Sequence, residues 1–262
     1  MTESTLFTAA FALYVLSTFV YFAALFARRV KWAGKGLAVA GAGLVFHTAA
    51  LVARTVTSGH APFTNMYESL SFFAWATVLA FAAIDRKFRL PKIGPYVMLI
   101  VVALVALASS PLMPKDATPL VPALQSYWLW LHVSVTLIGE AFFAVAFVAS
   151  ILYLAADSEE KREKFDSVSY RAVAVGFPLF TLGGLVFGMV WAYRAWGRYW
   201  SWDPKEVWSL ITWFVFALYL HTRIVMGWKG KRSAVVAIIG FLAALFTYFG
   251  VNYLLSSLHS YN

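Results

Sequence analysis

Long uncharged runs recur along this chain, and they limit its possible folds more than any other feature. The chain has 262 residues, of which 61% are hydrophobic and 13% are charged, so it is too apolar for a water-soluble domain of this length. A run of about 20 apolar residues is long enough to cross a bilayer as a helix, and in lipid only such helices or closed barrels satisfy the backbone. The runs are continuously apolar rather than alternating, which favours helices over barrel strands.

Eight of these runs are expected to span the membrane, which predicts an all-α polytopic membrane protein with one transmembrane domain over residues 1–262. Little chain remains between the runs for a soluble catalytic domain. The first run lacks a basic leader and a small-residue cleavage site, so no cleavable signal peptide is expected. The predicted spans are Thr5–Ala27, Gly36–Val56, Tyr67–Ile84, Ile93–Ser109, Ser126–Ala156, Arg171–Met189, Val207–Met226 and Ser233–Leu255.

The positive charges predict how the spans are oriented. Of the 21 Lys and Arg residues, 16 lie in or beside the loops after the first, third, fifth and seventh spans. Since Lys and Arg accumulate in cytoplasmic loops, both termini are predicted on the outer face. We therefore interpret the net charge of +9 as membrane orientation rather than nucleic-acid binding. The chain has no cysteine, which excludes disulfides, thiolate catalysis and cysteine-bound metal.

Between the sixth and seventh predicted spans, aromatic residues are concentrated. The stretch Trp196–Glu206 reads Trp-Gly-Arg-Tyr-Trp-Ser-Trp-Asp-Pro-Lys-Glu and holds three of the 11 tryptophans. Interfacial aromatic belts explain scattered tryptophans but account poorly for this density. Aromatic faces beside cations suit a flat, anionic, mostly apolar ligand, and Gly197 permits a close approach or an unusual backbone angle.

A structural role is also open for the acids of this stretch. Asp203 is suited to the N-cap of the seventh span, Pro204 to its first position, and Glu206 to the third position of a capping box. This role does not exclude a second one in ligand binding.

The five histidines fall into groups by predicted depth. His132 and His259 lie at the outer ends of spans, level with the tryptophan stretch, whereas His47 and His221 lie deeper. A single histidine in a helix is usually a packing or hydrogen-bonding residue. Two pairs at two depths favour axial ligands of haem iron, for which imidazole is common. His60 is interpreted as a solvated loop residue.

Two ionisable residues, Glu140 and Arg54, lie inside predicted spans. They require explanation, because such residues are costly in a membrane and usually functional. Glu140 has three roles open to it: orienting an imidazole, relaying a proton, or pairing with Arg54 or Arg223 for structure. The sequence does not separate these alternatives.

The tryptophan stretch resembles the WWD signature of haem-handling proteins in cytochrome c maturation, and with Asp-Pro-Lys-Glu it is similar to the CcsA/ResC branch. The resemblance covers nearly the whole chain and extends to Gly59–Glu68, Trp128–His132, His221–Arg223 and Asn252–Tyr261. The signature positions match without departure at Trp196, Gly197, Tyr199, Trp200, Trp202, Asp203, Pro204, Lys205 and Glu206.

The resemblance implies a function in system II cytochrome c biogenesis. Haem b is carried non-covalently, delivered to the outer face, and presented on the WWD segment, residues 191–208, to the Cys-x-x-Cys-His motif of apocytochrome c. A CcsB/ResB partner subunit is implied, with this chain as the haem-presenting subunit of a cytochrome c synthase, or haem lyase. The implied location is the bacterial inner membrane or the thylakoid membrane, with the WWD segment facing periplasm, exterior or lumen.

The resemblance also implies the residues of the sites. His132 and His259 match two external haem ligands, His221 matches one ligand of an inner site, and His47 is a candidate for the other by its position. The chain itself supplies no nucleophile, because it lacks a thiol. The implied haem contacts in the signature are Trp196, Gly197, Arg198, Tyr199, Trp200, Trp202, Asp203 and Lys205.

Two other classes of function stay open from the residues alone. A secondary transporter of an ion or small solute would use Glu140, Arg54 and the membrane histidines as a relay, but no inverted repeat or broken helix is clear. A purely structural membrane subunit would explain the aromatic residues but not the paired histidines.

Overall fold

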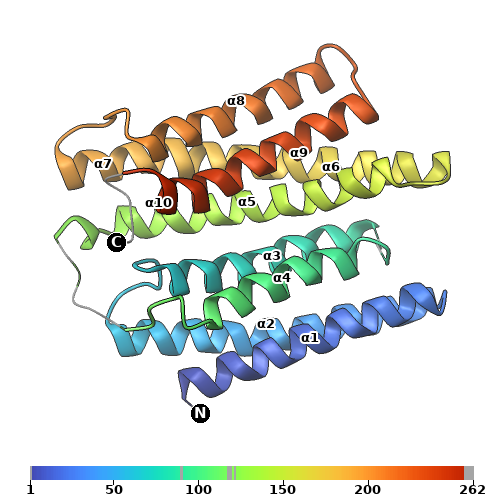
Figure 1. The fold of residues 1–262 in the computed structure, drawn as a ribbon, viewed down its shortest axis with the longest axis horizontal. Helices are drawn as coiled ribbons and strands as arrows, with labels where there is room; N and C mark the ends of the chain where they lie inside the picture. Colours follow the sequence, from blue (N-terminus) through green and yellow to red (C-terminus); the bar gives the residue numbers. More distant parts are fainter. Residues whose placement is uncertain (1, 89–90, 117–119, 121, 257–262) are drawn as a thin grey trace. The chain divides into compact units, whose positions relative to one another are not determined.

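The structure, a computed structural model, describes residues 2–88, 91–116, 120 and 122–256, and these residues form helices and connecting loops without a strand. The chain divides by its contacts into two compact units, Met1–Pro119 and Leu120–Asn262. Figure 1 shows the helices of each unit, coloured along the sequence.

Four helices are present in the described residues of the first unit. Their bounds are α1 Glu3–Phe26, α2 Val30–Ser58, α3 Met66–Phe88 and α4 Gly94–Ser109.

The second unit contains the remaining helices, two of which are interrupted by π-helical segments. Their bounds are η1 Pro122–Leu124, α5 Tyr127–Leu154, α6 Glu159–Phe180, the π-helix η2 Thr181–Phe187, α7 Gly188–Trp196, α8 Pro204–Ile224, α9 Lys231–Leu245, the π-helix η3 Phe246–Gly250 and α10 Val251–Leu254.

These helices confirm an integral membrane protein of the all-α class. In the part of the chain that the structure describes, seven helices are long and apolar enough to cross a membrane. The fourth predicted span, Ile93–Ser109, corresponds to α4, an apolar helix of 16 residues, or about 24 Å at 1.5 Å per residue. This is shorter than the hydrocarbon core of about 30 Å.

The segment between the fifth and sixth predicted spans is largely helical, which corrects the charged loop that its composition favours over residues 157–166. Helix begins at Glu159 and continues through α6, η2 and α7 to Trp196. Glu159 and Glu160 lie in the first turn of α6, where the helix dipole favours negative charge. A charged sequence at this place is therefore an additional helical segment rather than a loop.

Small residues determine the packing in the first unit. The rings of Tyr14 and Tyr21 on α1 are fully buried. A Cβ atom added at Gly43 of α2 would lie 2.7 Å from the Tyr14 ring, and one at Gly36 would lie 2.8 Å from the Tyr21 ring. The glycines therefore create the space that the two tyrosine rings occupy between α1 and α2.

In the second unit, α5 and α6 approach closely through facing glycines. A Cβ atom at Gly139 would lie 2.7 Å from the backbone nitrogen of Phe180, and one at Gly176 would lie 2.8 Å from the carbonyl oxygen of Gly139. Small residues at such crossings let helix backbones pack directly in membrane proteins. The Phe143 and Phe216 rings stack nearby, with centroids 3.6 Å apart.

We expect Gly139→Ala to lower the free energy of unfolding in detergent by about 1–3 kcal/mol, because the new methyl group meets backbone atoms that cannot rotate away. Gly41→Ala on α2 is the matched control, since a Cβ atom there has no neighbour within 4 Å. Thermal unfolding of both variants measures the difference. Equal midpoints for the two variants would show that the α5–α6 contact is not tight.

Candidate functional site

The tryptophan stretch begins where α7 ends, and a glycine ends that helix. Gly197 has a φ of 74° and lies in the left-handed region, with its N–H bonded to the Tyr193 carbonyl oxygen at 2.9 Å. This is the usual conformation of a helix C-cap and is favourable only for glycine or asparagine. Of the two roles left open for Gly197, the structure shows the unusual backbone angle.

The aromatic side chains after Gly197 form pairs. The rings of Tyr193 and Tyr199 stack with centroids 4.5 Å apart, and those of Trp200 and Trp202 meet edge to face at 5.8 Å. Trp202 is 69% exposed and has a φ of 60°. A bulky residue in this conformation is strained, and such strain concentrates at functional sites. The segment thus holds an aromatic side chain outward at an energetic cost.

The acids that follow form a helix cap, as predicted. Asp203 is the N-cap of α8 and Glu206 completes the capping box. The Glu206 Oε2 atom accepts hydrogen bonds from the backbone N–H groups of Ser201 at 2.8 Å and Asp203 at 3.2 Å. The Ser201 hydroxyl donates to the same oxygen at 3.1 Å. These bonds attach the loop that carries Trp200 and Trp202 to the start of α8.

His132 lies half-buried in the second turn of α5 and contacts the segment that leads to the tryptophan stretch. Its Nδ1 atom is 2.8 Å from the Gly183 carbonyl oxygen. Its ring stacks on the buried Trp191 ring with centroids 5.6 Å apart and an angle of 12° between the planes. The Trp191 ring in turn meets the Trp196 ring at 4.9 Å. The structure therefore brings His132 to the aromatic segment. His259 lies outside the described residues, and its pairing with His132 stays a prediction.

Lys205 is directed into the second unit rather than toward an open face. It is half-buried, and its ammonium group donates to the Asn252 Oδ1 atom at 3.1 Å. Its charge also interacts with that of Glu140, a residue that is only 4% exposed. Asn252 lies in α10, two residues after the end of the π-helix η3.

The proposed partners of Glu140 are corrected by this arrangement. Arg54 pairs with Glu68 at 2.8 Å, and Arg223 forms a two-pronged ion pair with Asp166. Both arginines therefore have acid partners of their own, and within the second unit the Lys205 ammonium acts on Glu140. The positive partner thus comes from the start of α8, which residue spacing alone does not reveal.

The two deeper histidines have different environments. His47 is fully buried in the first unit, where its Nδ1 atom is 3.2 Å from the Tyr14 hydroxyl and its Nε2 atom is 2.8 Å from the Ser71 hydroxyl. Iron at either ring nitrogen would have to replace one of these hydrogen bonds. His221 is exposed on α8 of the second unit, and its predicted pairing with His47 stays a prediction.

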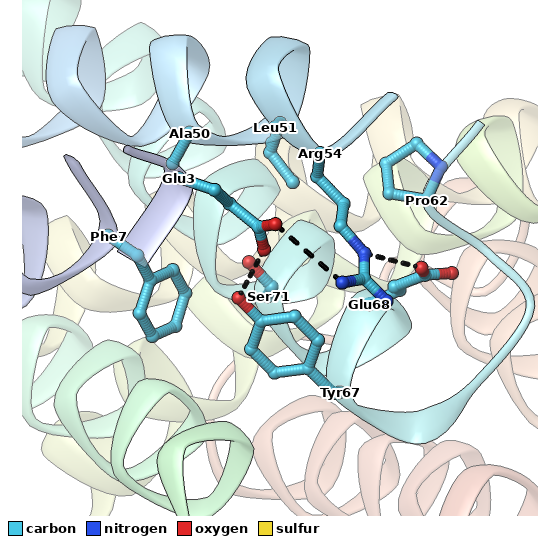
Figure 2. Close-up of a pocket in the computed structure, with 9 residues that line it drawn as sticks. All are labelled: Glu3, Phe7, Ala50, Leu51, Arg54, Pro62, Tyr67, Glu68 and Ser71. Atoms are coloured by element: carbon cyan, nitrogen blue, oxygen red, sulfur yellow. Dashed lines mark hydrogen bonds and ion pairs between the residues drawn. The ribbon is translucent and has the colours of Figure 1, made fainter. Parts of the chain in front are cut away.

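A polar cluster in the first unit joins side chains from α1, α2 and α3, which Figure 2 shows. Arg54 bridges two acids, since its guanidinium is 2.8 Å from Glu68 and 3.6 Å from Glu3. The Tyr67 hydroxyl donates to Glu3 at 3.0 Å. The cavity among these side chains has a volume of about 10 Å³, which is room for about one water molecule. Arg54 therefore joins α1, α2 and α3 and does not line a ligand pocket.

The interpretation of His60 as a solvated residue is wrong. Its side chain is only 6% exposed, and its Nδ1 atom is 3.0 Å from the Ala61 carbonyl oxygen. The loop after α2 folds inward because Ala61 and Phe63 are buried with it.

The sequence analysis did not single out the glycines that surround His132. Gly183 supplies the carbonyl group, and Gly188 leaves the space for the imidazole ring, because a Cβ atom there would lie 3.0 Å from its Cε1 and Nδ1 atoms. The available signal is the run Thr-Leu-Gly-Gly-Leu-Val-Phe-Gly over residues 181–188, where three glycines fall close together inside an apolar span.

We expect Asp203→Asn to leave the thermal stability unchanged and Asp203→Ala to lower it by about 1 kcal/mol. Asparagine is as good an N-cap as aspartate, whereas alanine provides no acceptor for the backbone N–H groups. Thermal unfolding of the two variants in detergent distinguishes the stability contributed by the N-cap hydrogen bond from that contributed by the carboxylate charge. A loss in the asparagine variant as large as that in the alanine variant would mean that the carboxylate charge matters beyond the cap.

The chain is similar to known proteins in its sequence and in its fold. The family of cytochrome c assembly proteins matches residues 63–259. The chain is 42% identical to the cytochrome c biogenesis protein CcsA of Chlamydomonas reinhardtii over 80% of its own length and 64% of that protein. It is 35% identical to CcsA of Gloeobacter violaceus over 97% of its own length and 94% of that protein. Its fold resembles that of the cytochrome c haem lyase CcmF, with a TM-score of 0.73 at 18% identity, over 98% of this chain and 48% of CcmF. The chain therefore belongs to the cytochrome c assembly protein family, among its CcsA-type members.

Proposed function

We propose that this chain holds haem b on the WWD segment, residues 191–208, and presents it for covalent attachment to apocytochrome c. The observation that carries the proposal is the position of His132, a half-buried imidazole fixed by a backbone carbonyl beside the exposed aromatic residues of the family signature. The names of the CcsA relatives support the biological process. The likeness to CcmF supports the fold alone.

The residues present fit a haem group. Imidazole is a common axial ligand of haem iron, and the Gly183 carbonyl holds the His132 ring in one orientation. Trp202 and Tyr199 are exposed and offer faces for stacking on a porphyrin. Arg198 is also exposed, and its guanidinium is suited to binding a propionate. When bound, haem supplies the vinyl groups that form thioether bonds with the cysteine thiols of the apocytochrome.

The chain's own part in the reaction is to bind and orient. It has no thiol, so its residues hold the ring and its iron in position, and such positioning is a large part of catalysis in reactions between two partners. His132 and His259 are the residues proposed to hold the iron. Ligation by two imidazoles would limit the reaction of the iron with oxygen.

Lys205 has a positioning role in this proposal. Its ammonium group is held by Asn252, and it lies two residues after Asp203, the residue that caps α8. Lys205 therefore connects the WWD segment to α10, the helix that contains Asn252. Arg198, which is exposed, is the better candidate for contact with a propionate.

An inner haem site is proposed at His221, which is exposed on α8 and so is reachable for a ligand. His47 remains the candidate for the second inner ligand, on the condition that it gives up its bond to Tyr14 or Ser71. We place the WWD segment on the outer face because the chain's Lys and Arg residues accumulate in the alternate loops. A CcsB/ResB-type subunit is the proposed partner.

A secondary transporter is less well supported. Arg54, one of the ionisable residues that a relay would use, is held in an ion pair with Glu68. This pair gives the arginine a structural role.

We expect the chain, purified with its partner subunit, to carry haem b with the absorption spectrum of six-coordinate low-spin iron. His132→Ala combined with His259→Ala removes both proposed external ligands, so the haem content falls and the remaining spectrum changes. The measurement is the absorption spectrum with the ratio of haem to protein.

The matched control is His221→Ala, which removes a histidine of the proposed inner site. We expect it to lower the haem content but to keep the low-spin spectrum of the haem that is bound. If the double variant retains both the content and the spectrum of the unaltered protein, the external site is wrong.

A further inference from the structure

We propose that the π-helix η2 positions His132 as an iron ligand: the Gly183 carbonyl holds its Nδ1–H, and Gly188 leaves the space for its ring. Gly183 and Gly188 are therefore positioning residues, and Nε2 is the atom presented to the iron. This inference rests on the proposed function, because it assumes that His132 binds haem iron.

The hydrogen bond determines the tautomer of the imidazole. A carbonyl oxygen only accepts, so the Nδ1 atom at 2.8 Å from the Gly183 oxygen must carry the proton. In the neutral ring, the lone pair is then on Nε2. Iron binds through a nitrogen lone pair, so the Gly183 carbonyl selects which nitrogen is the ligand.

In the π-helix, the Gly183 carbonyl oxygen accepts hydrogen bonds from two donors, His132 and Gly188. The Gly183 oxygen also accepts a hydrogen bond from the backbone N–H of Gly188, five residues later. In a regular α-helix that bond would come from the residue four positions later. A carbonyl oxygen has two lone pairs, so it can accept from both Gly188 and His132. Isolated π-helical turns of this kind are frequent at functional sites.

Neither Gly183 nor Gly188 has room for a side chain. A Cβ atom at Gly183 would lie 2.4 Å from the backbone nitrogen of Thr136. One at Gly188 would lie 3.0 Å from both the Cε1 and Nδ1 atoms of His132. The first glycine allows η2 to lie directly on α5, and the second allows the imidazole to lie against α7.

A third contact determines the plane of the ring. Trp191, three residues after Gly188, is 4% exposed and stacks nearly parallel to the imidazole. Gly183, Gly188 and Trp191 belong to one continuous helical segment, which therefore controls the proton, the space and the plane of His132. Hydrogen-bonded partners of this kind raise the basicity of a ligating histidine, and their loss typically weakens metal binding about ten- to a hundredfold.

The first test uses the haem-free protein and needs no altered glycine. Nitrogen-15 NMR of protein labelled at histidine distinguishes the two neutral tautomers, and the His132 signals are those absent from His132→Ala. The measurement is made at pH 8, above the ordinary histidine pKa of about 6.5. We expect the tautomer with the proton on Nδ1. A neutral His132 with its proton on Nε2 would overturn the inference, whether or not any glycine variant folds.

The second test compares two alanine substitutions in the same stretch. Gly188→Ala pushes a methyl group against the imidazole, and we expect it to weaken haem binding about ten- to a hundredfold, by analogy with other lost ligand supports. Gly184→Ala is the matched control, because its Cβ atom would lie 3.5 Å from the Phe180 ring, an ordinary contact. We expect it to bind haem like the unaltered protein. Haem titration of the complex with its partner subunit measures both.

The outcomes separate this inference from the proposed function. If His132→Ala weakens haem binding and Gly188→Ala does not, His132 is a ligand and the positioning by η2 is wrong. If His132→Ala leaves haem binding unchanged, the proposed external site itself fails, and the inference fails with it.

Discussion

In an apolar environment, a polar side chain has to find its partner within the protein, and the structure depends on this constraint. Leaving a buried polar group without a hydrogen bond costs several kcal/mol in hydrocarbon. Each unit meets the constraint with its own partners. Arg54 binds two acids in the first unit, and Asp166 binds Arg223 in the second. These pairs hold helix ends together in places where packing of apolar side chains alone would allow sliding.

The same constraint shapes the proposed haem site. His132 is hydrogen-bonded to a carbonyl that a π-helix makes available, and Lys205 is bonded to Asn252, two residues after the second π-helix. Both interactions are made by residues in or near an interruption in helical register. A π-helical turn adds one residue to the turn and is frequent at functional sites. The departures from regular helix in the second unit thus coincide with the residues that would hold a ligand.

Local patterns allowed several features to be predicted from the sequence. The capping box of Asp203 and Glu206 and the left-handed Gly197 were predicted because each depends on neighbours within a few residues. The start of the sixth helix was predicted wrongly, since a hydropathy pattern cannot tell a charged loop from a charged helical extension such as Glu159–Phe165. His60 was misjudged because burial of a loop depends on segments that pack against it.

The sequence by itself determined the class of the protein. Its apolar runs require membrane helices, and its tryptophan signature identifies the family, because both are properties of consecutive residues. Only the tertiary structure decided which polar groups meet. His132 and Gly183 are 51 residues apart, and Lys205 and Asn252 are 47 apart. Such contacts depend on how the helices cross and on where a glycine lets a ring or a backbone approach. The periodicity of residues along a helix does not predict them.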